Sequence, residues 1–107
     1  MARQSRSQRL LGQFERVLLI HADLELPAEP GVYFVASKQG TILYIGQSLN
    51  MKARWTQHNK TLPCLRAGAH YIYYQYTEEP ADLEAVYLDE YDPPLNYKHP
   101  PTIAGGF

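Results

Sequence analysis

The stretch from Gly31 to His58 constrains the fold of this chain more than any other segment. It contains two short runs of β-branched and aromatic residues on either side of the tight-turn sequence Lys38-Gln39-Gly40. Such runs predict two antiparallel strands joined as a hairpin. A helical segment follows, and Ser48 or Asn50 is its expected N-terminal cap. A hairpin followed by a helix is therefore the predicted centre of the fold.

Four side chains of this stretch are expected to meet on one surface. A turn centred on Lys38-Gln39 places Tyr33 directly opposite Tyr44, and directly opposed residues point to the same face of a sheet. Arg54 and His58 are four residues apart in the sequence, so they share one face of the predicted helix. If that face folds back over the hairpin, a guanidinium, an imidazole and two phenols converge.

A second pattern lies towards the end of the chain. A helix is predicted from about Pro80 to Tyr91, because proline suits the first turn of a helix and Pro93-Pro94 stops its propagation. Glu84 borders the apolar stripe of this helix. Taken alone, a glutamate in that place is most simply a solvated side chain.

Together these patterns resemble the GIY-YIG nuclease family. The two motifs of the family name correspond to Gly31-Val32-Tyr33 and Tyr44-Ile45-Gly46. Arg54 follows the second tyrosine by ten residues, and His58 comes four residues later, as the family pattern requires. Short aromatic tripeptides occur in many strands, so the order and spacing of the whole set carry the resemblance.

The C-terminal pattern extends the resemblance. The helix with Glu84 is similar to the one that carries the family's metal-binding glutamate, and Pro93-Pro94-Leu95-Asn96 is similar to its Pro-x-x-Asn element. The matching region runs from about Gly31 to Asn96. The resemblance implies that Glu84 binds one divalent cation, Mg²⁺ or Mn²⁺, and that Gly46 and Asn96 support the site.

The resemblance also implies an activity, the metal-dependent endonucleolytic hydrolysis of phosphodiester bonds in DNA. Tyr33 is then the general base, or the group that relays the proton of the attacking water, aided by Tyr44 or His58. A phenol has an ordinary pKa of about 10, so it needs nearby positive charge for this task. Arg54 supplies that charge, and its guanidinium can hold a phosphate oxygen through two hydrogen bonds.

The charge distribution fits contact with phosphate. The net charge is −1, but residues 31–70 contain no Asp or Glu, and residues 71–107 contain seven acidic residues and one lysine. Basic residues of the acid-free segment are the candidates for nucleic-acid contact: Lys38, Lys52, Arg54, Lys60 and Arg66. Charge alone is equally compatible with ordinary solvated faces.

Composition bounds the remaining possibilities. The 107 residues are expected to form a single domain, with 45% hydrophobic and 20% charged residues. No apolar run approaches the roughly 20 residues of a membrane span, and no signal peptide is recognised, so a cytoplasmic location is expected. Cys64 is the sole cysteine, which excludes an internal disulfide or a zinc knuckle.

The predicted architecture is an α/β domain with a small, mainly antiparallel three-stranded sheet flanked by helices. Residues 1–29 form an N-terminal helix and connector, 31–96 the family-like core and 97–107 a loose tail. Within these parts, the predicted elements are an amphipathic helix over 7–20, a connector over 26–30, a loop over 60–69 and a third strand over 70–77.

Two interpretations of function follow. The first is the DNA endonuclease, assisted by a targeting protein or acting as a homodimer, in repair or recombination. The alternative is a catalytically weak nucleic-acid-binding or protein-interaction module that retains the fold. A degraded module would be expected to lack at least one member of the candidate set, and this chain contains all of them: Tyr33, Tyr44, Arg54, His58, Glu84 and Asn96.

Overall fold

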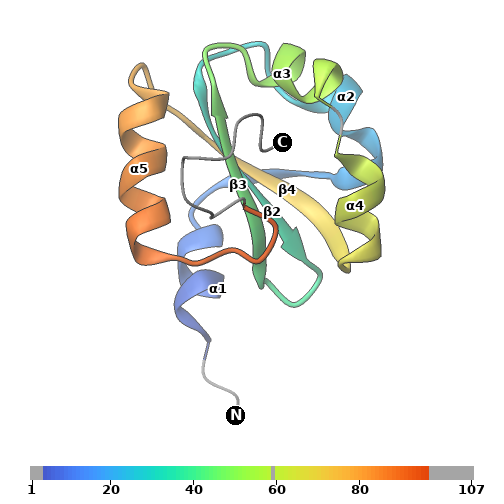
Figure 1. The fold of residues 1–107 in the computed structure, drawn as a ribbon, viewed down its shortest axis with the longest axis vertical. Helices are drawn as coiled ribbons and strands as arrows, with labels where there is room; N and C mark the ends of the chain where they lie inside the picture. Colours follow the sequence, from blue (N-terminus) through green and yellow to red (C-terminus); the bar gives the residue numbers. More distant parts are fainter. Residues whose placement is uncertain (1–3, 59, 97–107) are drawn as a thin grey trace, which may run out of the picture.

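The computed structural model describes residues 4–58 and 60–96, and it has the predicted α/β architecture (Figure 1). The predicted tail lies outside the described residues. Helices and strands occur in this order: α1 (Arg6–Leu11), β1 (Glu15–Leu18), the 3₁₀ turn η1 (Leu19–His21), α2 (Ala22–Glu25), β2 (Gly31–Ser37), β3 (Ile42–Ser48), α3 (Met51–Gln57), α4 (Thr61–Arg66), β4 (Ala69–Tyr76) and α5 (Pro80–Glu90).

The sheet has four antiparallel strands in the order β1-β4-β2-β3, one more than the sequence predicted. The additional strand, β1, comes from the segment predicted as the second half of a long helix. That helix ends early, at Leu11 with Gly12 as its C-terminal cap, and Val17 then pairs with Ile72 of β4. The apolar residues of this segment fit both the period of an amphipathic helix and the alternation of a strand. Pairing with β4 therefore decides its structure.

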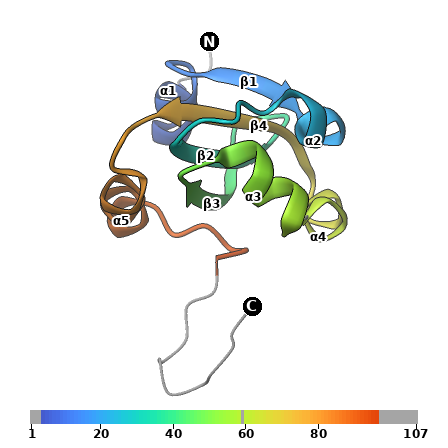
Figure 2. The same cartoon turned by 90° about the horizontal axis from the view of Figure 1, so that it is seen from above.

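Helices cover both faces of the sheet (Figure 2). One face packs against α2, α3 and α4, and the other packs against α1 and α5. Tyr33 and Val35 belong to the core of the first face, and Phe34 and Tyr73 to that of the second. The side chains of β2 alternate between the two cores, as a strand buried on both sides requires.

The hairpin register differs from the predicted one. Tyr33 pairs with Gly46, and Tyr44 pairs with Val35, so the two tyrosines are not directly opposite each other. A register shift between Val35 and Ala36 leaves Leu43 as the extra residue of β3. Because the displacement is two residues along the strand, Tyr33 and Tyr44 still point to the same face.

The helices after the hairpin follow the sequence in part. Asn50 caps α3, since its side-chain oxygen accepts a hydrogen bond from the Ala53 backbone N–H at 3.0 Å. The predicted loop over 60–69 contains α4 instead, in which Pro63 occupies the first turn, where proline is tolerated. The prediction for α5 is confirmed to within one residue. None of the helices in the described ranges has the length and apolarity needed to cross a bilayer.

Candidate active site

The first candidate tyrosine lies across the glycine of the second motif. A Cβ atom built on Gly46 would stand 2.6 Å from the hydroxyl oxygen of Tyr33 and in collision with its ring. The absence of a side chain at Gly46 therefore lets the phenol of Tyr33 extend over β3. This contact gives Gly46 a physical role in the site.

Tyr33 is held from two further sides. Its ring centroid is 6.4 Å from that of Tyr44, with the planes tilted by 41°, and 6.1 Å from that of Trp55, which meets it edge to face. Tyr33 is buried, and Tyr44 is only partly so. Trp55 follows Arg54 directly in α3, so the helix that presents Arg54 also packs on the candidate catalytic tyrosine.

Arg54 and Glu84 act electrostatically on both phenols. Burial raises the pKa of Tyr33, with the Tyr44 phenol and Glu84 adding to the shift, and Arg54 opposes it through its charge and a side-chain hydrogen bond. Burial also raises the pKa of Tyr44, against the effect of Arg54. Side chains from β2, β3, α3 and α5 thus lie within electrostatic reach of one another. The sequence analysis proposed that the two phenols meet Arg54 and His58, and the resemblance added Glu84.

The raised pKa of Tyr33 leads to a prediction about alkaline stability. The unfolded phenol ionises near its ordinary pKa of 10.0, and the folded phenol ionises at a higher pH. The free energy of unfolding should therefore be unaffected by this group below pH 10 and fall as the pH rises above it. Urea denaturation over this range should show a steeper decline for the wild type than for Tyr33→Phe. Parallel curves would mean that Tyr33 does not contribute to the decline.

Glu84 has the properties of a metal ligand. Its carboxylate is half-buried, burial raises its pKa, and only Arg54 opposes that shift. Within the described residues it forms neither a hydrogen bond nor an ion pair, and no cluster of three potential ligands is present there. A single carboxylate suits Mg²⁺, which keeps several waters and bridges to substrate phosphate. The residues present therefore fit one such ion.

Asn96 clamps the strand between the two motif residues Tyr44 and Gly46. Its Oδ1 accepts a hydrogen bond from the Ile45 backbone N–H at 2.8 Å, and its Nδ2 donates to the Ile45 carbonyl at 2.9 Å. The Leu95 N–H donates to the Leu43 carbonyl in the same way at 2.9 Å. Since β3 is an edge strand, this segment satisfies backbone groups that the sheet leaves unpaired.

Replacing Asn96 with alanine should loosen this edge. Two partly buried backbone groups of Ile45 lose their partners, which is expected to lower the free energy of unfolding by about 1–3 kcal/mol. Any cleavage of DNA strands should also become slower, because Tyr44 and Gly46 flank Ile45, the residue that loses its hydrogen bonds. Chemical denaturation and a nicking assay on the same preparation test this expectation. Loss of activity at full stability would instead indicate direct contact of Asn96 with substrate.

Lys60 and Cys64 are neighbours of the site that the sequence did not identify as such. The Lys60 Nζ lies 5.6 Å from the centroid of the Tyr44 ring, in cation–π geometry. Burial raises the pKa of the Cys64 thiol to about 11, and Lys60 opposes the shift. Lys60 was predicted only as a nucleic-acid contact. Its approach to Tyr44 depends on α4, which the sequence pattern did not reveal.

The remaining candidates, His58 and three basic residues, lie on α3, on α4 and at the hairpin tip. His58 is the exposed C-terminal cap of α3, and its imidazole has no ring contact or ion pair with the rest of the described chain. Lys38 is at the tip of the hairpin, and Arg66 ends α4. Lys52 lines a separate hollow beside α3. Of the predicted basic contacts, the structure brings Arg54 and Lys60 to the tyrosines.

Residues 29–98 match the sequence profile of the GIY-YIG catalytic domain, and this segment contains both tyrosines, Arg54, Glu84 and Asn96. The chain belongs to the GIY-YIG family. The family assignment confirms the resemblance noted in the sequence. The matched segment begins after α1 and β1. The family pattern therefore could not predict the fourth strand.

Curated relatives of this GIY-YIG domain include UvrABC system proteins C. The protein from Lachnospira eligens is 34% identical over 70 residues, which are 61% of this chain and 11% of that protein. The protein from a Cyanothece strain is 57% identical over 30 residues, 28% of this chain and 5% of the relative. The chain thus spans about a tenth or less of the length of these relatives.

Solved structures agree with the family assignment. The GIY-YIG N-terminal endonuclease domain of UvrC from Thermotoga maritima, bound to magnesium as its catalytic divalent cation, is 27% identical. Its TM-score is 0.60, with 74% of this chain and 96% of that chain covered. A point mutant of the same domain reaches a TM-score of 0.63 at 24% identity. About three quarters of this chain therefore shares its fold with the GIY-YIG domain of UvrC.

Proposed function

We propose that this chain is a divalent-metal-dependent endonuclease that hydrolyses phosphodiester bonds in DNA. The observation that carries the proposal is the convergence of Tyr33, Tyr44, Arg54 and Glu84 from four different elements at one place in a GIY-YIG fold. A module that only binds nucleic acid needs no half-buried carboxylate without a protein partner. The binding-module alternative is accordingly less favoured.

The protein groups divide the reaction among them. Arg54 holds a non-bridging phosphate oxygen through paired N–H donors and offsets the charge that develops at phosphorus. Tyr33 and Tyr44 orient the attacking water and accept its proton, with Arg54 favouring the ionised phenol. Burial raises the pKa of both phenols, so each holds its own proton at neutral pH. The phenol that takes the proton of the water must therefore release its own proton, to His58 or to bulk water.

Glu84 would hold one Mg²⁺, with Mn²⁺ as a substitute. When bound, this ion supplies Lewis-acid stabilisation of the leaving oxygen. Asn96 and Gly46 act as positioning residues, the first through the backbone of Ile45 and the second by leaving room for Tyr33. His58 is proposed as a helper at the rim of the site, where its exposed position gives it access to substrate.

Substrate contact beyond the reacting phosphate is proposed for the basic residues of the acid-free segment. Arg54 and Lys60 lie nearest the tyrosines, and Lys52, Arg66 and Lys38 extend the basic surface along α3, α4 and the hairpin tip. A double-strand cut would need a second copy of the chain or two successive visits, because one such site cuts one strand at a time. A targeting protein would direct the chain to its substrate.

Supercoiled plasmid incubated with the purified protein and Mg²⁺ tests the proposal. Conversion to the nicked form, followed by slower appearance of the linear form, is expected, and EDTA should abolish both. Mn²⁺ should restore cutting after EDTA treatment and its removal. Cutting that persists in EDTA would contradict a metal-dependent mechanism, and binding of plasmid without any cutting would favour the alternative module.

A further inference from the structure

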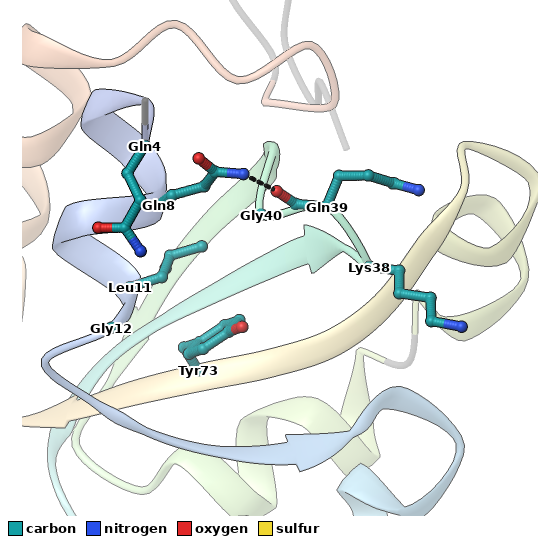
Figure 3. Close-up of a pocket in the computed structure, with 8 residues that line it drawn as sticks. All are labelled: Gln4, Gln8, Leu11, Gly12, Lys38, Gln39, Gly40 and Tyr73. Atoms are coloured by element: carbon teal, nitrogen blue, oxygen red, sulfur yellow. Dashed lines mark hydrogen bonds between the residues drawn. The ribbon is translucent and has the colours of Figure 1, made fainter. Parts of the chain in front are cut away.

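A hollow on the far side of the sheet from the tyrosines has no role in the proposed chemistry. It has a volume of about 470 Å³ and is formed by α1, the β2–β3 turn and Tyr73 of β4 (Figure 3). Tyr73 belongs to the second core, and Tyr33 to the first, so the two sites lie on opposite faces of the sheet. Because α1 lies outside the family-matched residues 29–98, the hollow is a feature of this chain and not of the family profile.

The hollow has a fixed frame. Gln8 of α1 donates from Nε2 to the Gln39 carbonyl at 2.6 Å, and Ser7 donates to the Gly40 carbonyl at 2.9 Å. These bonds join the helix to the hairpin turn above Tyr73, as Figure 3 shows for the first of them. The opening is therefore held by hydrogen bonds between two segments far apart in the sequence.

The chemistry of the lining favours an anion. No acidic residue lines the hollow, and Lys38 of the turn, whose ammonium points outwards from the hollow in Figure 3, forms no ion pair with any residue in the described ranges. Arg16 adds a second cation behind Tyr73: its guanidinium lies 3.9 Å from the Tyr71 ring centroid and donates from Nη1 to the Tyr73 hydroxyl at 3.2 Å. The Tyr73 oxygen thus acts as acceptor, which leaves its own proton to donate to a ligand.

Nearby carboxylates do not neutralise this surface. Residues 4–14 and 31–77 contain no Asp or Glu, and these ranges supply every residue of the lining. The carboxylate of Glu90 does reach α1, but it accepts a hydrogen bond from Arg6 at 2.6 Å and is thereby paired. An anionic ligand would meet little opposing charge in the hollow.

We propose that this hollow is a second binding site for a phosphodiester strand of nucleic acid. The choice of a nucleic-acid strand among anions rests on the proposed nuclease function. The distance between the hollow and the tyrosines follows from β3. Gly40 lines the hollow just before this strand, and Gly46 lies in the strand next to Tyr33, six residues further on. Six residues of extended chain span roughly 20 Å. A strand passing around the hairpin tip could then contact both, with Lys38 on its path.

Binding of labelled single-stranded oligonucleotides in EDTA, measured by fluorescence anisotropy, tests the proposal without cleavage. Lys38→Gln should weaken the binding of a long oligonucleotide several-fold and lower the salt slope by about 0.7, the amount expected for one lost phosphate contact on a single strand. Oligonucleotides too short to span roughly 20 Å from the tyrosines should bind the variant and the wild type in a more similar way.

A second variant adds charge without removing a native contact. Gly12 has an α-helical backbone conformation, and a Cβ there would meet only backbone oxygens at 3.4 and 3.8 Å. Gly12→Glu should therefore fold normally and weaken binding by placing a carboxylate at the hollow. Leu24→Glu, at a leucine that is 74% exposed on α2, makes the same change in net charge away from the hollow and should bind like the wild type.

The proposal is overturned if Lys38→Gln and Gly12→Glu bind the long oligonucleotide as Leu24→Glu does. It is also overturned if polyglutamate binds with the same dependence on Lys38 and excludes DNA, because the ligand would then be an acidic protein segment. If the wild type fails to nick plasmid but the two variants still weaken oligonucleotide binding, the strand site stands and the nuclease function fails.

Discussion

Glu84→Gln should lower the rate of plasmid nicking by a factor on the order of 10³. The substitution keeps the shape of the side chain and removes the charge that holds the divalent cation. Because burial raises the pKa of the Glu84 carboxyl, the fold disfavours its ionised form. The neutral amide should therefore leave the stability of the metal-free protein unchanged or slightly higher.

The matched control for this variant is Asp89→Asn. Asp89 is exposed on the same helix, α5, and its replacement makes the same change in net charge. It should nick plasmid at the wild-type rate. A thermal melt adds an independent readout, because Mg²⁺ should stabilise the wild type and Asp89→Asn more than Glu84→Gln. Equal nicking by Glu84→Gln and the wild type would remove Glu84 from the mechanism.

Gly46→Ala is the second substitution for which we expect a large effect. The new methyl group would occupy the space of the Tyr33 phenol, which would have to move or push β3 outwards. Overpacking of this kind should lower the free energy of unfolding by about 1–3 kcal/mol. Nicking should fall on the order of 10²-fold, because a displacement of about 1 Å of a catalytic group has that effect.

Gly12→Ala is the control, since a methyl group there makes only ordinary contacts. Its stability should match that of the wild type. A double-mutant cycle identifies the cause: in a Tyr33→Ala background, Gly46→Ala should be much less destabilising than in the wild type. Additive effects would show that the destabilisation arises from something other than the Tyr33 ring.

The sequence anticipated most of the elements from residue 31 onward, because local signals there are strong. The β-branched and aromatic runs, the capping Asn50 and the first-turn Pro80 each specify structure through short-range physics. The second half of the segment over 7–20 was assigned wrongly, because the local signals there are ambiguous. Its apolar spacing suits a helix or a strand, and only the exposed edge of β4 determines that residues 15–18 pair as a strand.

The candidate site divides in a similar way. Residue types and spacing sufficed to nominate Tyr33, Tyr44 and Arg54, since side-chain chemistry and strand alternation are local properties. Glu84 was added by the family resemblance. The approach of Lys60 to Tyr44 could not be foreseen, because it depends on how α4 packs against the sheet. The hollow at Tyr73 depends in the same way on the docking of α1 against the hairpin turn.

What the sequence by itself determined is the set of reactive groups and the face of the hairpin on which the tyrosines stand. A shift of two residues in register left that face unchanged, because side chains alternate with a period of two. The tertiary structure alone decided which groups meet. It brought Glu84 of α5 to the phenols and Asn96 to the backbone of Ile45, contacts between residues distant in the chain. Such contacts depend on the packing of whole elements, which local patterns do not encode.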